Sequence, residues 1–340
     1  MQWQASHGRN HLPWQQTRDP YRVWLSEIML QQTQVSTVLG YYQRFLDAFP
    51  DVASLAAAPQ DAVLALWSGL GYYSRARNLH QCAQTVMEQW GGAFPQTAEE
   101  LATLPGIGRS TAGAISSFCF SERVPILDAN VRRVLTRVLA FDADLAQSRN
   151  EKQLWEHAQQ LCPTENLHEA MPRYTQGMMD LGASVCTSRK PTCLVCPLHS
   201  ECRAARAGNP ENYPVRTRKI KRSSESWWLL LAVDVQRRVW LQKRPQAGIW
   251  AGLYSPPVFE DYAALQSHAQ AAWPQDGTRG WQDLPGFLHV LTHKDLHLHP
   301  VLVPVDQAYA ALVSEADESC WADAAAWAEL GLPAPIRKLL

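Results

Sequence analysis

The sequence predicts a chain of two parts: a large all-α region followed by a smaller α+β domain. Up to about residue 206, apolar residues recur at helical spacing, and capping boxes (Thr97 with Glu100, Ser148 with Glu151) open two predicted helices. Residues 207–226 are rich in polar, basic and Pro/Gly residues and are predicted as a linker. From residue 227, short apolar runs alternate with polar residues, which is typical of strands. We therefore expect domains at 1–206 and 227–340.

Composition excludes disorder and a membrane protein. The 340 residues are enough for two hydrophobic cores, and 46% hydrophobic residues with 14 tryptophans indicate folded domains. The N-terminus has no basic region followed by an apolar core, and the longest apolar run, Trp227 to Val233, is too short to cross a bilayer. We expect a soluble cytoplasmic protein with no membrane partner.

The charge is distributed unevenly along the chain. Residues 1–222 hold 23 Lys+Arg against 19 Asp+Glu, and residues 223–340 hold 8 against 13. The basic excess is mild, so phosphate binding is expected to be local, at Arg109, Arg132 and Arg133 and along the run Arg216 to Arg222.

The first predicted long helix, at about residues 20–35, carries a glutamate among apolar neighbours. An irregular stretch with His11-Leu12-Pro13-Trp14 precedes it. Glu27 has Val23 and Trp24 one turn before it and Leu30 one turn after it. A carboxyl in such surroundings should have a raised pKa, as a general acid requires. The alternative is an exposed helix glutamate.

A helix at Asp61 to Trp67 and a long one ending at about Trp90 flank Gly69-Leu70-Gly71-Tyr72-Tyr73. Glycines before two tyrosines form a turn that could present an aromatic wedge to nucleic acid, where stacking is worth ~1–3 kcal/mol per base. Ordinary packing of the tyrosines between helices is equally compatible.

A glycine hairpin at Leu104-Pro105-Gly106-Ile107-Gly108 separates two further helices, the second starting near Ser110. Proline ends the first helix, and both glycines permit positive φ and leave backbone amides uncovered. These amides at a helix N-terminus suit one phosphate of a nucleic-acid strand. The alternative is a plain turn.

Asp128 precedes an amphipathic helix with Val131, Val134, Leu135 and Val138 on one face. Asp128 or Asn130 could be only its N-cap. A carboxylate at a helix N-terminus should also have a low pKa and stay ionised.

Four cysteines lie within 17 residues, in the pattern Cys186-x6-Cys193-x2-Cys196-x5-Cys202. In a chain without an export signal, they indicate metal ligands rather than disulfides. Zinc sites more often pair two C-x-x-C units, and a single compact loop also suits a [4Fe–4S] cluster. The scattered Cys82, Cys119, Cys162 and Cys320 are predicted to be buried.

In the C-terminal part, strands are predicted at Trp228–Val235, Val239–Lys243, Leu288–Leu291 and Leu296–Val303, with helices near Asp261–Trp273 and Trp321–Leu330. His289, His297 and His299 alternate along this region, and we interpret them as surface residues rather than metal ligands.

Together, the hairpin, Glu27, Asp128 and the cysteine spacing resemble the helix-hairpin-helix DNA glycosylases, specifically the iron–sulfur branch with endonuclease III and the adenine DNA glycosylases of the MutY type. Gly248-Ile249-Trp250-Ala251-Gly252-Leu253 resembles the C-terminal MutT-like (Nudix) domain of the latter. The acidic Mg²⁺-binding Nudix signature is missing, so this domain should bind rather than hydrolyse. The resemblance covers essentially the whole chain and is weaker from residue 226.

The resemblance implies removal of adenine mispaired with 8-oxoguanine or guanine in double-stranded DNA, by a monomer that would be nucleoid-associated in a bacterium. Glu27 would protonate the flipped base, Asp128 would stabilise the sugar cation, and Asn130 would hydrogen-bond near Asp128. The adenine pocket would be lined by Leu12, Trp14, Gln15 and Gln176. Gln32 and Tyr72 would enter the duplex.

The hairpin residues Gly106, Gly108 and Arg109 would bind a DNA phosphate, and Cys186, Cys193, Cys196 and Cys202 would hold a [4Fe–4S] cluster in the loop 186–202. Thr292 and His293 would contact 8-oxoguanine, although Leu291 stands where the family has an aromatic residue, and Ala129 where it commonly has glycine.

Ser110, expected to contact substrate, stands where the lyase branch has a lysine nucleophile. Hydrolysis without strand cleavage is therefore expected. An endonuclease III-like pyrimidine glycosylase/lyase and a non-catalytic iron–sulfur DNA-binding protein are the alternatives. Ser110 and the C-terminal domain disfavour the first, and the presence of both acids disfavours the second.

Overall fold

The computed structural model describes residues 1–217, 221–274, 280–306 and 318–340. Arg218 and Lys219 of the predicted basic run therefore lie outside the described residues. The chain divides into two compact units, one formed by Met1–Ala56 with Gln81–Lys219 and the other by Ala57–His80 with Ile220–Leu340. Each unit is described by itself.

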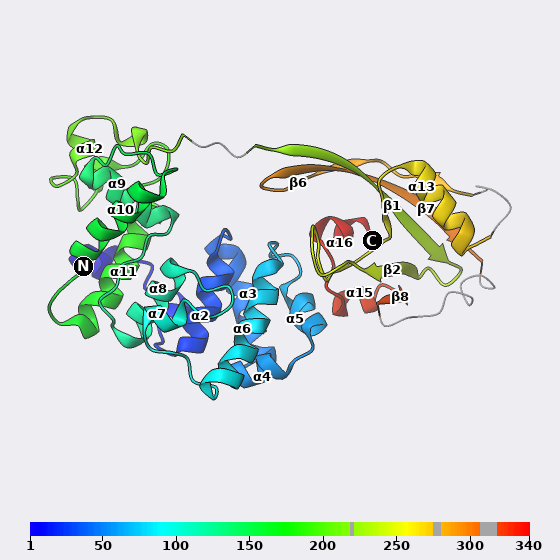
Figure 1. The fold of residues 1–340 in the computed structure, drawn as a ribbon, viewed down its shortest axis with the longest axis horizontal. Coiled ribbons are helices and arrows are strands. Elements are labelled where there is room, and N and C mark those ends of the chain that lie inside the picture. Colours follow the sequence, from blue (N-terminus) through cyan, green and yellow to red (C-terminus); the bar gives the residue numbers. More distant parts are fainter. Residues whose placement is uncertain (218–220, 275–279, 307–317) are drawn as a thin grey trace. The chain divides into compact units, whose positions relative to one another are not determined.

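The first unit is helical, as predicted (Figure 1). Its elements are α1 (Gln2–His7), η1 (Pro13–Gln15), α2 (Pro20–Leu30), α3 (Val35–Ala48), α4 (Val52–Ala57, at the boundary), the second half of α6 (Ser74–Trp90), α7 (Ala98–Leu101), α8 (Arg109–Phe120), α9 (Ala129–Leu139), α10 (Ser148–Gln160), α11 (Leu167–Ser184), η2 (Cys193–Val195), α12 (Arg203–Arg206) and η3 (Pro210–Asn212).

A core inside this unit joins α8 to α11. Ala114, Leu135, Leu154 and Leu181 are buried together there, one from each helix. Burying a leucine side chain stabilises a fold by about 2 kcal/mol. This core holds in place the N-termini of α8 and α9, where the hairpin and Asp128 lie.

The predicted helix at 20–35 is wrong at residues 31–34, because α2 ends at Leu30 and α3 begins at Val35. Gln32 between them has φ 58°, a left-handed conformation that a continuous helix excludes. The break turns the chain immediately after Glu27. It also places Gln31 to Gln34 in a loop rather than on a helix.

Of the two predicted capping boxes, one is confirmed. Thr97 Oγ1 accepts from the backbone N–H of Glu100 (3.2 Å) and caps α7. Ser148 does not cap α10, whose N-cap is Gln147 with no side-chain hydrogen bond. Glu151 instead forms an ion pair with Arg132, so a tertiary partner has displaced the local one.

The second unit contains a mixed sheet with the strand order β3-β2-β1-β7-β5. Its elements are α5 (Gln60–Trp67), the first half of α6, β1 (Ser223–Asp234), β2 (Val239–Lys243), β3 (Tyr254–Ser255), β4 (Val258–Phe259), α13 (Tyr262–Ala272), β5 (Gln282–Asp283), β6 (Phe287–Val290), β7 (Lys294–Val305), β8 (Ser319–Ala322), α15 (Ala326–Glu329) and α16 (Ala334–Leu339).

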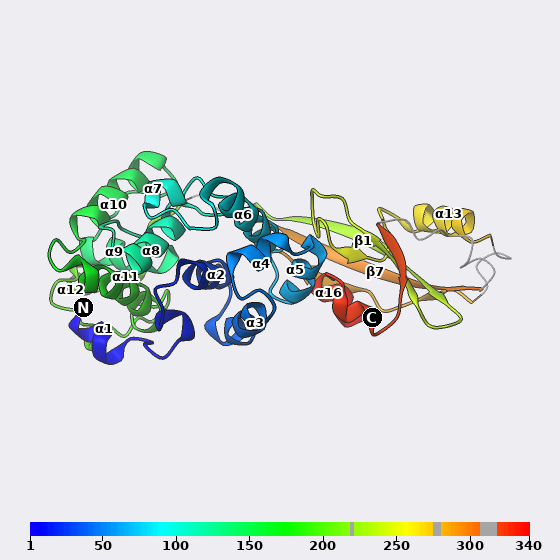
Figure 2. The ribbon, with the colours of Figure 1, turned by 90° about the horizontal axis from the view of Figure 1, so that it is seen from below.

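The long strands β1 and β7 run parallel side by side (Figure 2), paired from Ser223 with Lys294 to Asp234 with Val305. Leu265, Ala269 and Trp273 of the α13 segment pack with the apolar residues of these strands. The α+β class predicted for this region is thus confirmed.

Two predictions in this unit are wrong. β1 begins at Ser223, inside the segment predicted as a linker, because pairing with β7 extends it. The helix predicted at Trp321–Leu330 is a strand followed by a short helix: Trp321 pairs with Trp240 of β2, and only Ala326–Glu329 is helical. Long-range pairing has overridden the local helical pattern.

Residues 57–80 belong to this second unit, which the sequence did not indicate. Lys243 Nζ pairs with Asp61 Oδ1 (2.7 Å). The hydroxyls of Ser68 and Tyr73 both donate to the carbonyl oxygen of Leu332 (2.9 Å each). These bonds tie the turn around Tyr72 to the C-terminal sheet domain.

Candidate active site

Glu27 lies near the end of α2, half-buried. The carboxylate of Asp19 caps the helix by accepting from the backbone N–H groups of Tyr21 (2.8 Å) and Arg22 (3.3 Å). The helix buries Trp24, an apolar neighbour of Glu27. Burial and, secondly, the negative charge of Asp128 raise the pKa of Glu27 from 4.5 to about 8, so the carboxyl is mostly protonated at pH 7. The predicted rise is confirmed.

Asp128 is the N-cap of α9, and its Oδ1 accepts from the backbone N–H of Val131 (2.7 Å). The low pKa predicted for this carboxyl is wrong: burial raises the pKa of Asp128, and this outweighs the N–H groups of Val131 and Asn130 and the charges of Arg133 and Arg132. These four groups favour the ionised form of Asp128. Among the described residues, no such group acts on Glu27.

One cavity of about 650 Å³ in the first unit contains both acids. It is also lined by the predicted residues Leu12, Trp14, Gln15, Gln32, Ser110, Asn130 and Gln176. These side chains come from four separate segments of the chain, so the cavity exists only in the folded unit. The volume is within the range of small-molecule pockets, about 300–1,000 Å³.

Two polar residues hold the chain around Asp128. Ser110 Oγ accepts from the backbone N–H of Leu127 (3.0 Å), which ties the start of α8 to the residue before Asp128. Asn130 reaches Asp128 through its backbone N–H. The Asn130 side-chain oxygen accepts from Arg133 (2.9 Å), and Arg133 also donates to the carbonyl of Cys186 (2.7 Å).

Sequence reasoning missed Asp180 and Arg9. Gln176 Nε2 donates to Asp180 Oδ1 (2.9 Å), and Arg9 Nε donates to the same oxygen (2.7 Å). Asp180 is only 1% exposed, so this bond fixes the orientation of the Gln176 amide. The i, i+4 spacing of Gln176 and Asp180 on one helix was the signal that could have found the pair.

The side-chain amide of Gln15, unlike that of Gln176, is not hydrogen-bonded to any of the described residues. Its Nε2 and Oε1 atoms are both buried, and neither has a hydrogen-bond partner among the described residues. A buried amide left unpaired costs about 1–3 kcal/mol, which a bound polar ligand would relieve.

The hairpin before α8 uses one of its glycines as predicted. Gly106 has φ 76°, which favours glycine. Gly108 is the N-cap of α8 with φ −83°, so its backbone does not use the positive φ that glycine permits. Arg109 is exposed, and its guanidinium lies 4.0 Å from the ring centroid of Trp155, a cation–π contact.

Cys186, Cys193, Cys196 and Cys202 line one small apolar cavity. Arg137, 1% exposed, holds their loop by donating to the Cys186 thiol (3.4 Å) and to the carbonyls of Thr187 (2.6 Å) and Ser188 (3.0 Å). All eight cysteines of the chain are thiols, as predicted for the loop. Cys82 and Cys162 are buried as expected, but Cys119 and Cys320 are only half-buried.

Comparison with known proteins agrees with this geometry. Residues 25–160 match the HhH-GPD superfamily of base excision DNA repair proteins, and residues 228–340 match the NUDIX domain. The chain is 35% identical to adenine DNA glycosylase of Buchnera aphidicola (subsp. Acyrthosiphon pisum), an alignment that covers 100% of this chain and 95% of that protein. The chain belongs to the adenine DNA glycosylase family.

A second relative, the adenine DNA glycosylase of Mus musculus, is 35% identical over 89% of this chain and 69% of its own length. Among solved structures, a thermostable thymine-DNA glycosylase superposes with a TM-score of 0.53 and 27% identity, covering 61% of this chain and 93% of its own. As an adenine DNA glycosylase, the protein is a base-excision repair hydrolase of N-glycosidic bonds. No helix in the described part of the chain is long and apolar enough to cross a membrane.

The remaining predicted site residues of this adenine DNA glycosylase lie in the second unit. Tyr72 is exposed, with φ 47° after Gly71 at φ 70°. Its hydroxyl is hydrogen-bonded to Thr292 Oγ1 (3.1 Å), in the turn between β6 and β7. His293 is the exposed neighbour of Thr292. The fold thus brings Tyr72 and Thr292 together from distant parts of the chain.

Two of the alternating histidines of this unit contact other side chains. Within the described ranges, no three His, Cys, Asp or Glu side chains are grouped so as to hold a metal ion. His299 stacks on Trp228 (4.6 Å between ring centroids), and His297 bonds to Ser224 (3.1 Å). Only His297 is fully exposed, so the surface interpretation holds for that residue but not for the half-buried His289 and His299.

Proposed function

We propose that this adenine DNA glycosylase removes adenine mispaired with 8-oxoguanine or guanine, by hydrolysis without cutting the DNA strand. The observation that carries the mechanism is that the carboxyls of Glu27 and Asp128 line one cavity. Glu27, with a pKa of about 8, is neutral at pH 7 while the charge of Asp128 acts on it. This is the division of labour that cleavage of a glycosidic bond requires.

In the proposed reaction, Glu27 donates its proton to N7 of the flipped adenine, so that the base leaves uncharged when the bond from C1′ to N9 breaks. The electrons of that bond go to the base, and positive charge develops at C1′ and the ring oxygen. Asp128 stabilises this charge, and water adds its oxygen to C1′. The proton released by the water passes to the Glu27 carboxylate, which restores the acid for the next reaction.

Adenine recognition would use the amides in the cavity. With the nitrogen of Gln176 bonded to Asp180, its oxygen is the end that would accept from the amino group of adenine. Gln15 would gain the partners it lacks. Leu12 and Trp14, both buried, supply apolar walls. Gln32, held at φ 58° on the cavity lining, and Tyr72 would enter the duplex.

Ser110 supports hydrolysis rather than lyase chemistry. Its hydroxyl is occupied by the Leu127 N–H, and no amine is at this position to attack the sugar. Ser110→Lys would place an amine on the cavity lining. Borohydride trapping of DNA by the variant but not by the wild type is the expected result, and trapping by the wild type would contradict the proposal.

The second unit would recognise 8-oxoguanine through Thr292 and His293, with Tyr72 beside Thr292. We propose a helical glycosylase domain within residues 1–206, a linker from residue 207 that ends where β1 begins at Ser223, and a monomer in solution. The bare amides of Gly106 and Gly108 with Arg109 would bind a DNA phosphate. If the protein is bacterial, it would act at the nucleoid.

The four cysteines suit a [4Fe–4S] cluster. They line one cavity, and they come from a single compact loop of the sequence, which suits a cluster held by four thiolates. Cys186, Cys193, Cys196 and Cys202 would hold this cluster, which would cross-link the loop.

The deciding experiment is a glycosylase assay on duplexes that pair adenine, thymine or cytosine with 8-oxoguanine or guanine. Release of adenine from both adenine mispairs, with intact strands until alkali is added, is expected. Release of thymine or cytosine would contradict the proposed specificity. Strand cleavage without alkali would contradict the proposed chemistry.

A further inference from the structure

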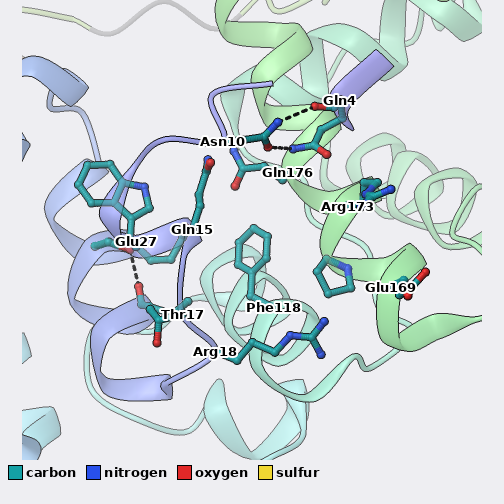
Figure 3. A pocket seen from close by; sticks show the side chains of 14 residues that line it. Gln4, Asn10, Gln15, Thr17, Arg18, Glu27, Phe118, Glu169, Arg173 and Gln176 are labelled. Atoms are coloured by element: carbon teal, nitrogen blue, oxygen red, sulfur yellow. Dashed lines mark hydrogen bonds between the residues drawn. The ribbon is translucent and has the colours of Figure 1, made fainter. Parts of the chain in front are cut away.

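A second cavity in the first unit, whose lining residues are drawn in Figure 3, shares a wall with the cavity that holds the two acids. Trp14, Gln15, Glu27 and Gln176 line both spaces, whereas Asp128 and Asn130 line only the first. We call the second space the rear cavity. Its other polar lining residues are Gln4, Asn10, Thr17, Arg18, Ser26, Glu169 and Arg173. The residues proposed to hold the base therefore border two spaces.

The rear cavity reaches solvent, since Arg18, Glu169 and Arg173 on its lining are exposed. Figure 3 shows Glu169 and Arg173 across the cavity from Glu27, with Phe118 between them. Cations and carboxyls are mixed along this lining, which is unlike the all-cationic lining that a phosphate requires. The volume of about 300 Å³ is at the lower end for small-molecule pockets. These properties suit one uncharged, hydrogen-bonding base.

Within the shared wall, the Gln15 side chain has no hydrogen bond to the described residues that would fix its orientation. Trp14 is buried and packs edge-on against Tyr42 (5.2 Å between ring centroids). Gln176 is fixed by its bond to Asp180 (2.9 Å). Gln15 has no hydrogen bond at either amide atom among the described residues, so rotating its side chain breaks none. Gln15 can therefore open the wall at the smallest cost.

We propose that the excised purine base leaves through the rear cavity, past Gln15, while the abasic DNA still fills the front cavity. This rests on the proposed function, in which the base is cut free beside Glu27. The abasic sugar beside Asp128 would block the front, whereas the lining behind Glu27 is open to solvent. The base leaves uncharged, because the Glu27 proton balances the electron pair that it takes from C1′, and the mixed lining of the rear cavity accepts a neutral molecule.

The test measures release of adenine and of DNA separately. Enzyme in excess is mixed with a duplex that carries tritiated adenine opposite 8-oxoguanine, and unlabelled duplex is added as a trap. Excision is scored after a denaturing quench, free adenine by rapid filtration, and DNA dissociation with a label on the strand. The wild type should free adenine at least tenfold faster than it releases DNA.

Arg173→Trp narrows the exposed end of the rear cavity, and Phe118→Trp narrows its interior. Each should leave the excision rate within about twofold and slow adenine release at least fivefold. Glu88→Trp, on an exposed position of α6 outside both cavities, is the matched control and should change neither rate.

Adenine that leaves the wild type only together with DNA would overturn the exit route. Adenine release at the wild-type rate from Arg173→Trp and Phe118→Trp would overturn it as well. If the denaturing quench shows no excised adenine at all, the proposed function itself has failed. The two failures are therefore distinguishable, and the excision rate of Arg173→Trp reports whether that variant is folded.

Discussion

The raised pKa of Glu27 predicts that its neutral isostere, Glu27→Gln, stabilises the protein in alkaline solution. A carboxyl whose pKa is higher in the folded than in the unfolded state binds its proton more tightly when folded. Its contribution to stability is therefore complete below pH 4.5 and is lost as the pH rises toward 8. Glutamine at this position has no charge to bury at any pH.

The size of the effect follows from the two pKa values. A tenfold change in proton affinity is worth about 1.4 kcal/mol, so the rise from 4.5 to about 8 sets a ceiling of ~5 kcal/mol. The Glu27 side chain is half-buried and faces a cavity, where water reduces the cost of its charge. We expect Glu27→Gln to gain about 2 kcal/mol relative to the wild type between pH 5 and pH 9.

The assay is urea unfolding of both proteins at half-unit pH steps, followed by the fluorescence of their tryptophans. The gap between the two free energies of unfolding should widen from pH 5 and level off above pH 8. Glu88→Gln, at an exposed position, should show no such widening. A constant gap for Glu27→Gln across the whole range would refute the buried, protonated state of Glu27. Adenine excision by this variant should be lost at every pH.

Three further predictions concern the same machinery. The single-turnover rate of adenine excision should fall about tenfold per pH unit above pH 8, as Glu27 loses its proton; a rate that rises from pH 8 to 9 would contradict this role. Asp128→Asn keeps an oxygen that can cap α9, so DNA binding and stability should remain. The rate of adenine excision should fall ~10³-fold or more. Turnover near the wild-type rate would remove Asp128 from the mechanism. Arg137→Met leaves the carbonyls of Thr187 and Ser188 without their donor, at a cost of about 1–3 kcal/mol each. The variant should have a lower unfolding midpoint and a lower visible absorbance of the cluster. Unchanged absorbance would contradict the role of Arg137 in holding the cysteine loop.

Local patterns predicted much of the active site because each depends on neighbours in the chain. Asp128 caps α9 because the cap needs only an oxygen three residues before an N–H. Glu27 has a raised pKa because it is buried and because the charge of Asp128 acts on it, and of these two causes the apolar neighbours in the sequence indicated only the burial. Two predictions failed because a distant partner competed with the local pattern. Arg132 binds Glu151, so the capping box with Ser148 does not form, and pairing with Trp240 of β2 places Trp321 in a strand rather than a helix.

The pKa of Asp128 shows the limit of local reasoning. The helix N-terminus predicts a lowered pKa, and the N–H groups of Val131 and Asn130 do act in that direction. Burial in the folded unit acts the other way and is larger, and burial depends on segments that are far from Asp128 in the sequence. Asp180 was missed for a similar reason, since its partner Arg9 is 171 residues away.

The sequence by itself determined the two fold classes, the start of the helix capped by Asp128 and the four clustered thiols, because helix propensity, capping and ligand spacing act over a few residues. Only the tertiary structure decided that Glu27 and Asp128 share one cavity, that Asp180 orients Gln176, and that residues 57–80 join the C-terminal unit. These three features depend on which surfaces of the chain pack together and exclude water. The packing of the whole chain determines those contacts, and no single segment does so alone.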